Sequence, residues 1–248
     1  MAKILFTALD PVSSAVFKRN REYCHGLGLQ ELRPNSMPLA VVGGGHSTTK
    51  NIKELQDFDG EVWAINEAFQ WCNDNNIKAT FYAIDPSPDL ATVCGGVKKA
   101  ILGDTCDPSL FEALKDAEIQ LAEIRGPNGI QATISAAATA PFIASRIGHT
   151  HLTYFGCEGS FETTTHLYEG PRTKDAPNPR LWVNCGGTEY LTTSQYVMGT
   201  EFIADVARMV PTWITAADDG FLAALIKHGD YDVTHVSREI QNALEAAA

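Results

Sequence analysis

Short apolar runs alternate with stretches of helical periodicity through most of the chain. Each apolar run is short and bounded by polar or turn residues, which is typical of strands that are buried on both faces of a parallel sheet. We expect strands at Leu39–Val42, Glu61–Ile65, Ala79–Ile84, Lys99–Leu102, Ile119–Ile124, Leu152–Phe155 and Thr212–Thr215. We expect helices at 48–58, 67–75, 108–115, 134–147, 188–209 and 220–228. This alternation predicts an α/β fold with an open, mostly parallel sheet and helices on both faces.

Two breaks in the pattern suggest how the chain is organised. Residues 12–26 have a loose helical spacing, and the run from Pro34 to Pro38 interrupts the chain. We therefore expect a helical lead-in over 1–37 and a single α/β domain over 38–248. The rhythm stops again between 156 and 187, so we expect an irregular, lid-like insert at about 157–187. A terminal helix is expected at 239–248.

Composition and charge exclude several classes of protein. The chain has 248 residues, a hydrophobic fraction of 44% and a formal net charge of −11, which makes it a poor general binder of nucleic-acid backbones. No apolar run approaches the ~20 residues of a membrane span. The start of the chain is interrupted by Asp10-Pro11 too early for a signal peptide, and none of the six cysteines forms a Cys-x-x-Cys pair. We expect a cytoplasmic protein with free thiols.

The first candidate for chemistry is a glycine-rich turn after the strand Leu39–Val42. Gly43, Gly44 and Gly45 would let backbone N–H groups approach a ligand, and Ser47 or Thr48 could cap the helix that follows. The free N–H groups of a helix start favour a phosphate. The motif is neither Gly-x-Gly-x-x-Gly nor a Walker A loop. A tight turn with a plain cap is the alternative interpretation.

Four further candidates stand at or near strand ends. Asn66 follows the strand Glu61–Ile65, Asp85 follows Ala79–Ile84, and Glu158 follows Leu152–Phe155. Ser135 lies near the start of an alanine-rich helix. Because ligands of open α/β sheets bind outside the carboxyl ends of the strands, we expect Asn66, Asp85 and Glu158 to share one edge with the glycine turn. Taken singly, Asn66 and Ser135 could be helix caps, and Asp85 before proline could form a turn.

One histidine is placed to act as a general acid or base. His166 lies in the irregular segment that could cover the ligand edge, and its ordinary pKa is close to neutral. An exposed histidine with no role is the alternative. The sequence contains neither a Gly-x-Ser-x-Gly elbow nor a His-Glu-x-x-His zinc helix.

The order of these motifs resembles that of a known family. The matching segments are Gly43-Gly-Gly-His-Ser47, Ala64-Ile-Asn66, Tyr82-Ala-Ile-Asp-Pro-Ser87, Ile134-Ser-Ala-Ala-Ala138 and Phe155-Gly-Cys-Glu158. In this order they are similar to the 6-hydroxymethylpterin diphosphokinase MptE-like family, which includes the flagellin-modifying motility accessory factors. A related layout occurs in the bacterial sialyltransferases that use CMP-sialic acid. The resemblance covers roughly residues 38–160 and, more weakly, the helix that contains Thr192-Thr-x-x-Tyr196. This chain has His46, Thr48 and Glu158 where the family usually has Pro, Leu and Asp.

The resemblance implies a Rossmann-like domain that binds a nucleotide or nucleotide-sugar and transfers a group from it. It places Gly44, Gly45 and Ser47 at phosphate or ribose, and Ser135 near the phosphates. It places Asn66 and Asp85 at the nucleotide or its Mg²⁺ ion, and Glu158 near the sugar or base. A loop histidine is the base in the sialyltransferases, which makes His166 the candidate here.

Three hypotheses follow. The first is a transferase with a small-molecule donor and acceptor, either glycosyl transfer from a CMP-sugar or Mg²⁺-dependent diphosphate transfer from ATP. The second is a methyltransferase that uses S-adenosylmethionine, although its second strand would be expected to end in an acid rather than in Asn66. The third is a nucleotide-binding protein of the same fold without catalytic activity. The oligomeric state is left open by the sequence.

Overall fold

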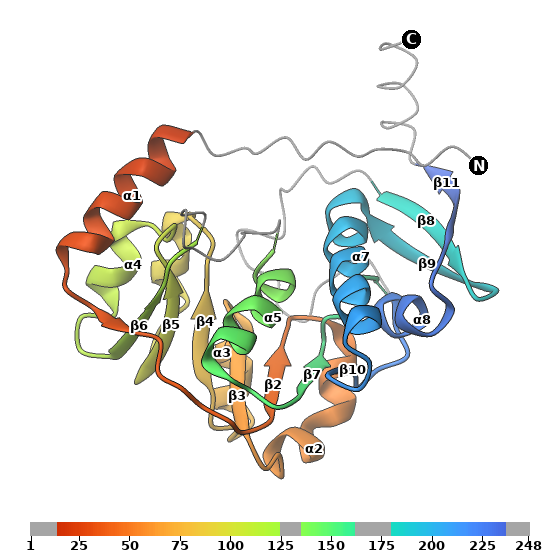
Figure 1. The fold of residues 1–248 in the computed structure, drawn as a ribbon, viewed down its shortest axis with the longest axis horizontal. Helices are drawn as coiled ribbons and strands as arrows, with labels where there is room; N and C mark the ends of the chain where they lie inside the picture. Colours follow the sequence, from red (N-terminus) through yellow and green to blue (C-terminus); the bar gives the residue numbers. More distant parts are fainter. Residues whose placement is uncertain (1–13, 125–134, 162–179, 237–248) are drawn as a thin grey trace.

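An eight-stranded parallel sheet forms the centre of the molecule. The computed structural model describes residues 14–124, 135–161 and 180–236 (Figure 1). The strand order of the sheet is β1-β6-β5-β4-β3-β2-β7-β10, and every neighbouring pair is parallel. Its strands are β1 (Gln30–Glu31), β2 (Leu39–Val42), β3 (Glu61–Ile65), β4 (Thr80–Ala83), β5 (Lys99–Gly103), β6 (Glu118–Ala122), β7 (Leu152–Phe155) and β10 (Ile214–Ala216). The α/β prediction is confirmed.

The strand order reverses at β2. From β2 the chain adds β3, β4, β5 and β6 in turn on one side, and it then returns to place β7 and later β10 on the other side. The arrowheads of β2 and β7 point to the same edge of the sheet (Figure 1). The carboxyl ends of β2 and β7 therefore define a topological switch point, where open α/β sheets bind their ligands.

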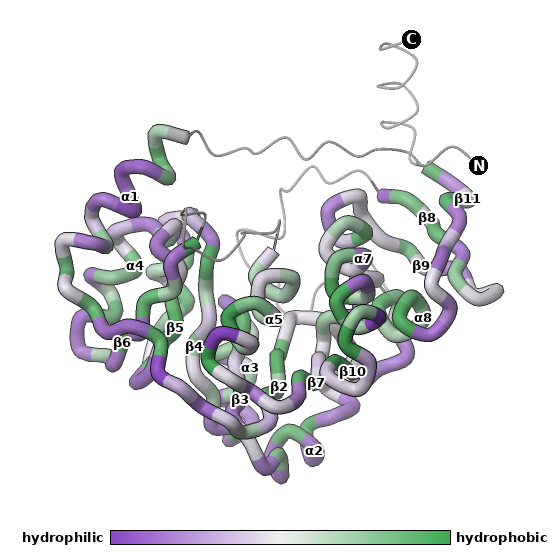
Figure 2. Tube along the Cα trace, viewed as in Figure 1, coloured by the Kyte–Doolittle hydropathy of each residue, from purple (hydrophilic) through white to green (hydrophobic). Residues whose placement is uncertain are grey.

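Helices cover both faces of the sheet, as predicted. The helices are α1 (Ser14–Gly26), α2 (Ile52–Gln56), α3 (Ala68–Asp74), α4 (Pro108–Ala113), α5 (Ala136–Ile147), α7 (Ser194–Met209) and α8 (Phe221–His228), with 3-10 helices η1 (His46–Asn51) and η2 (Pro88–Thr92). Residues of α1, α2, α3 and α4 share one hydrophobic cluster with alternate strand positions, and residues of α5 and α7 share the other. Figure 2 shows the hydrophobic residues gathered along the central strands.

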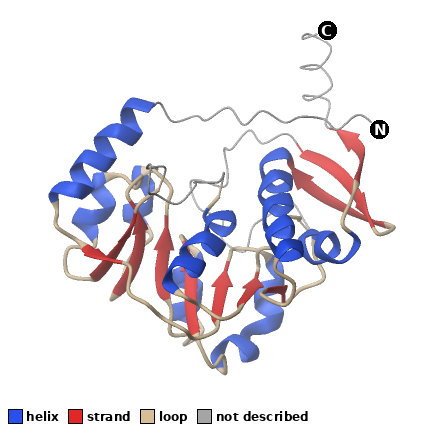
Figure 3. Cartoon of the chain, viewed as in Figure 1, coloured by secondary structure: helices blue, strands red, loops and turns tan. Residues whose placement is uncertain are grey.

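A small antiparallel sheet lies beside the large one. Its order is β11-β8-β9, made of β8 (Arg180–Cys185), β9 (Thr188–Thr193) and β11 (Asp232–Val236). Figure 3 shows both sheets in red, with α7 and α8 next to the smaller one. Leu181 and Val183 of β8 share a third hydrophobic cluster with Val197 of α7 and Phe221 of α8.

Three expectations about local structure are wrong in part. Residues 188–193 form β9 rather than the first turns of a helix, and α7 begins only at Ser194, capped by the Thr193 hydroxyl. Arg180–Cys185 is a strand within the segment expected to be irregular. The first turns of the helix expected over 48–58 are the 3-10 helix η1. The strands β1 and β11 were not expected, and the tail helix at 239–248 lies outside the described residues.

The lead-in helix α1 is fastened to the sheet by polar contacts. Arg21 Nε donates to Asp104 Oδ2 at 2.8 Å, and the Asn20 side chain donates to the carbonyl of Thr105 at 2.9 Å. Strand β1 joins the sheet beside β6. All six cysteines are free thiols. None of the helices in the described part of the chain combines the length and the apolar character that a bilayer crossing requires.

Candidate functional site

Three strand-end loops meet at the switch point around the side chain of Glu158. Glu158 follows β7, and only 8% of it is exposed. Its Oε1 accepts a hydrogen bond from the backbone N–H of Ser47, in the loop after β2, at 2.7 Å. Its backbone carbonyl accepts a bond from the N–H of Leu222, after β10, at 2.8 Å, which fixes the start of α8 against the β7 loop. Glu158 thus joins the loops of β2, β7 and β10.

The glycine turn is shaped to receive this carboxylate. A Cβ atom on Gly45 would overlap the Glu158 carboxylate, and one on Gly43 would overlap the carbonyl of Gly156. The N–H of Gly45 donates to the Gly156 carbonyl at 2.8 Å. Gly44 differs from both, because a Cβ there would meet no atom within 4 Å. Close packing on the β7 loop therefore explains Gly43 and Gly45, and Gly44 is the glycine whose surroundings are open.

Ser47 and Thr48 do not cap the helix in the way the sequence suggested. Gly45 is the N-cap residue of η1, and it makes no side-chain cap bond. The Thr48 hydroxyl is buried and donates to the Gly45 carbonyl at 2.7 Å, which closes the turn. The Ser47 hydroxyl instead donates to Asp218 Oδ2 at 3.1 Å. Both side chains hold the loop after β2 in place.

Asp218 is a site residue that the sequence analysis did not identify. It lies two residues after β10, and its Oδ1 accepts a bond from the N–H of Gly220 at 3.1 Å. Burial first, and the nearby Glu158 charge second, raise the pKa of Asp218 to about 6. The strand-end rule that selected Glu158 would have found it, since Asp218-Asp219-Gly220 follows the strand expected at 212–215.

Asn66 lies at the carboxyl end of β3 with a left-handed backbone, at a φ of 50°. Its N–H donates to the Tyr82 carbonyl at 3.1 Å, which holds the turn against β4. Its side-chain Oδ1 is buried and accepts no hydrogen bond from the described residues. Buried polar atoms are nearly always paired, so this oxygen is a candidate acceptor for a ligand donor.

Asp85 and Ser135 have local structural roles at the same side of the fold. Asp85 Oδ1 accepts a bond from the N–H of Ser87 at 2.9 Å, which forms a tight turn after β4. Ser135 is the N-cap of α5, and its hydroxyl accepts a bond from the N–H of Ala138 at 3.2 Å. The interpretations as turn former and helix cap are thus correct. They leave a contact with a ligand open as a prediction.

The hydroxyl of Tyr196, in α7, is close enough to the loops after β3 and β7 for their charged groups to affect its pKa. Burial raises the pKa of its hydroxyl to about 12, and the charges of Cys157, Glu158 and Glu67 add to the shift. Burial likewise holds the pKa of the Cys157 thiol well above its ordinary value. Both groups are therefore protonated near neutral pH, and Tyr196 is a hydrogen-bond donor rather than a base. The sequence analysis included Tyr196 in the weaker part of the resemblance but gave it no role in the site.

Two of the predictions about catalytic groups remain to be tested. His166 lies outside the described residues. Among residues 14–124, 135–161 and 180–236, no group of three or more His, Cys, Asp or Glu side chains is arranged to hold a metal ion. Asp85 as a Mg²⁺ ligand stays a prediction.

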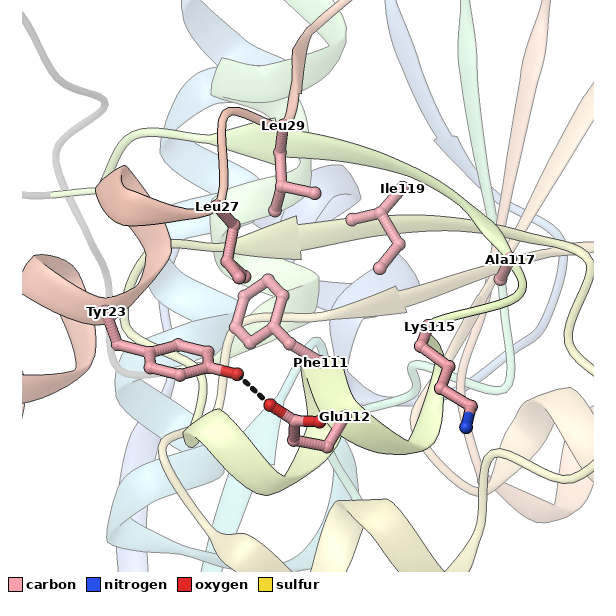
Figure 4. A pocket seen from close by; sticks show the side chains of 8 residues that line it. All are labelled: Tyr23, Leu27, Leu29, Phe111, Glu112, Lys115, Ala117 and Ile119. Atoms are coloured by element: carbon pink, nitrogen blue, oxygen red, sulfur yellow. Dashed lines mark hydrogen bonds between the residues drawn. The ribbon is translucent and has the colours of Figure 1, made fainter.

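A separate pocket of about 240 Å³ opens between α1, α4 and β6. Figure 4 shows its mostly apolar walls and the hydrogen bond from the Tyr23 hydroxyl to Glu112 Oε1. The lining residues are Tyr23, Leu27, Leu29, Phe111, Glu112, Lys115, Ala117 and Ile119. None of them belongs to the loops of the switch point, so this pocket is distinct from the candidate site.

Sheet order and strand-end loops together define a Rossmann-like α/β protein whose candidate site lies between β2 and β7. The fold is similar to that of the MAf glycosyltransferase from Magnetospirillum magneticum AMB-1, with a TM-score of 0.56 and 16% identity. The match covers 83% of this chain and 36% of that one, so the chain spans about a third of the length of the glycosyltransferase. At this identity the likeness establishes the fold alone.

A second solved structure carries no argument about this chain. A protein described as a putative deoxyribose-phosphate aldolase from Coccidioides immitis reaches a TM-score of 0.28 at 10% identity, over 79% of this chain and 83% of its own, which is too low for a shared fold. No protein-family model matches the chain, and no curated protein matches it in sequence.

Proposed function

We propose that the chain binds a nucleotide-activated sugar at the carboxyl edge of β2, β3 and β7 and transfers the sugar to an acceptor hydroxyl. The observation that carries this proposal is the buried, unpaired Oδ1 of Asn66 at the end of β3. An unsatisfied buried polar atom at a ligand edge is a feature that folding alone does not favour. A base or ribose donor group would satisfy this oxygen.

Other features of the same sheet edge favour a nucleotide over an apolar ligand. Gly44 leaves open space beside the turn after β2, which suits a close approach of phosphate to backbone. The fold shared with a glycosyltransferase favours sugar transfer over diphosphate transfer. The proposal includes the nucleotide of the donor and a Mg²⁺ ion that would bind with it.

A thermal-shift screen tests the proposal. The ligands are CMP, CDP, UDP, ATP, S-adenosylmethionine and NAD, each with and without Mg²⁺. A ligand at 100 times its dissociation constant stabilises the fold by about 2.7 kcal/mol, which raises the Tm of a chain of this size by about 5–10 °C. We expect a shift with CMP, CDP or UDP. A shift with S-adenosylmethionine alone would favour the methyltransferase, and no shift with any nucleotide would overturn the proposal.

Binding is then separated from catalysis with the matching sugar donor. The released nucleotide is measured for CMP-sialic acid and for UDP-N-acetylglucosamine, with water or a simple sugar alcohol as the acceptor. Cleavage that exceeds the rate without protein supports a transferase. Binding without cleavage of either donor would favour the nucleotide-binding protein without catalytic activity.

A further inference from the structure

The carboxylate of Asp218 is held at the switch point by the loop after β2 and by its own turn. Strand β10 pairs with β7 in parallel, and the N–H of Ala217 donates to the Tyr154 carbonyl at 2.9 Å. These backbone contacts fix the position of Asp218 relative to the end of β7. Its Oδ2 accepts from the Ser47 hydroxyl and its Oδ1 from the Gly220 N–H, both at 3.1 Å. Each carboxylate oxygen can accept two bonds, so each keeps one acceptor position beyond these contacts.

Asp218 differs from Glu158 in its access to solvent. Asp218 is half-buried, whereas only 8% of Glu158 is exposed. The charged groups that act on Asp218 are Glu158 of the β7 loop and Asp219 of its own turn, and the Ser47 hydroxyl of η1 donates a hydrogen bond to it. Asp218 in turn acts on the Cys157 thiol, whose pKa it helps to raise. Burial and the Glu158 charge raise the pKa of Asp218 to about 6. The carboxylate is therefore mostly ionised at neutral pH and still basic enough to take a proton.

Glu158 is placed to hold Asp218 rather than to meet a substrate. Its carboxylate accepts a hydrogen bond from the Ser47 N–H and fills the space that a side chain on Gly45 would occupy. A Cβ atom on Gly220 would overlap the Glu158 side chain, so the turn that carries Asp218 rests directly on it. Glu158 thus sets both the position and the basicity of Asp218.

We propose that Asp218 accepts the proton of the acceptor hydroxyl in the transfer reaction, and that Glu158 is the positioning residue for Asp218. This inference rests on the proposed function. In the reaction the acceptor oxygen forms a bond to the anomeric carbon of the donor as its proton moves to an Asp218 oxygen. The bond from the anomeric carbon to the phosphate oxygen breaks, and its electron pair leaves with the nucleotide. Asp218 then returns the proton to water.

The titration of Asp218 is measured directly by NMR on protein with ¹³C-labelled aspartate carboxyls. We expect one signal that titrates near pH 6, is missing in Asp218→Asn and moves to lower pH in Glu158→Gln. Asp219→Asn, a change at the exposed neighbour, is the matched control and keeps that signal. An Asp218 signal that titrates at the ordinary value near 4, or that Glu158→Gln leaves in place, would overturn the inference.

The pH dependence of donor cleavage tests the catalytic role, with CMP-sialic acid and UDP-N-acetylglucosamine as donors and water as the acceptor. We expect kcat/KM of the wild type to rise as the pH increases through 6, and we expect this rise to occur at lower pH in Glu158→Gln. In Asp218→Asn the rise should be absent. The rate of that variant should be lower by about 10²–10⁴-fold, while its affinity for the donor stays nearly unchanged. If Asp218→Asn keeps the rise and His166→Ala loses it, the loop histidine is the base and the role of Asp218 is overturned.

The failures of the two proposals are distinguishable. If the wild type cleaves neither donor, the proposed function fails and the proton transfer to Asp218 fails with it. If the wild type cleaves a donor and Asp218→Asn does so at a similar rate, sugar transfer stands and only the role of Asp218 is rejected.

Discussion

The carboxylate of Glu158 occupies the space into which a side chain on Gly45 would extend. A Cβ atom on Gly45 would overlap it, and the same carboxylate accepts the N–H of Ser47 at 2.7 Å. A backbone N–H of the loop after β2, where a phosphate was expected, is thus engaged by an anion that the chain itself provides. Gly45 is required by the packing of Glu158, whatever ligand binds beside it.

Gly45→Ala is expected to destabilise the protein. The added methyl group must displace a buried carboxylate and weaken its bond to Ser47, which we expect to cost about 1–3 kcal/mol. Urea denaturation measures the loss. Gly44→Ala is the matched control, because a Cβ at Gly44 meets nothing within 4 Å. In a Glu158→Ala background the cost of Gly45→Ala should fall, and an unchanged cost would show that the two residues are not coupled.

Asp218→Asn is expected to stabilise the protein at neutral pH. Because the pKa of Asp218 is raised to about 6 in the folded state, ionisation at pH 7 costs folding free energy. Wild-type stability should therefore fall, through this group, as the pH rises from about 4 to about 6. Each pKa unit corresponds to about 1.4 kcal/mol, and partial solvent access reduces the effect to about 1–2 kcal/mol in total.

The check is the difference in the free energy of unfolding between Asp218→Asn and the wild type at pH 4 and at pH 7.5. The difference should be near zero at pH 4 and favour the variant at pH 7.5. Asp219→Asn controls for the loss of one acidic charge from the same turn. A variant that is less stable than the wild type at pH 7.5 would show that Asp218 is a turn residue.

Arg21→Ala is expected to loosen α1 from the sheet. Arg21 pairs with Asp104, whose side chain is only 2% exposed, and Asp104 Oδ1 also accepts the N–H of Ile124 at 2.8 Å. Removing Arg21 leaves a buried carboxylate without its cation, at a cost of about 3–5 kcal/mol. Hydrogen exchange should show faster exchange in α1. Lys18→Ala removes an exposed pair with Glu22 and should change little.

The strands of the large sheet could be predicted because their apolar runs leave few alternatives. Leu39–Val42 is buried at every position, and Glu61–Ile65 was placed at its observed bounds. The strand β9 was missed because Thr188–Thr193 runs directly into α7 without a break in sequence. Residues 188–193 form a strand because they pair with β8. The local sequence pattern of this segment, which favoured a helix, does not show that pairing.

The sequence predicted which residues lie at the candidate site better than it predicted how they contact one another. Glu158 and Ser47 were identified, and the switch point does bring them together, but as partners of each other. Asp218 was overlooked because β10 is short and late in the chain, although β7 is its neighbour in the sheet. Sequence order conceals that adjacency, because the chain places β8, β9 and α7 between the two strands.

Asn66→Gly is expected to abolish nucleotide binding without destabilising the protein. Glycine adopts the left-handed backbone of Asn66 freely and removes only the side chain with its unpaired Oδ1. Asn76→Gly is the matched control, since Asn76 has a similar φ of 57° but is exposed in the loop before β4, at the opposite edge of the sheet. Isothermal titration with the nucleotide found by the screen measures both variants. We expect a loss of affinity of at least about tenfold in Asn66→Gly and none in Asn76→Gly, since a lost hydrogen bond to a buried group costs about 1–3 kcal/mol. Equal affinity in the two variants would remove Asn66 from the site and, with it, the observation on which the proposed function depends.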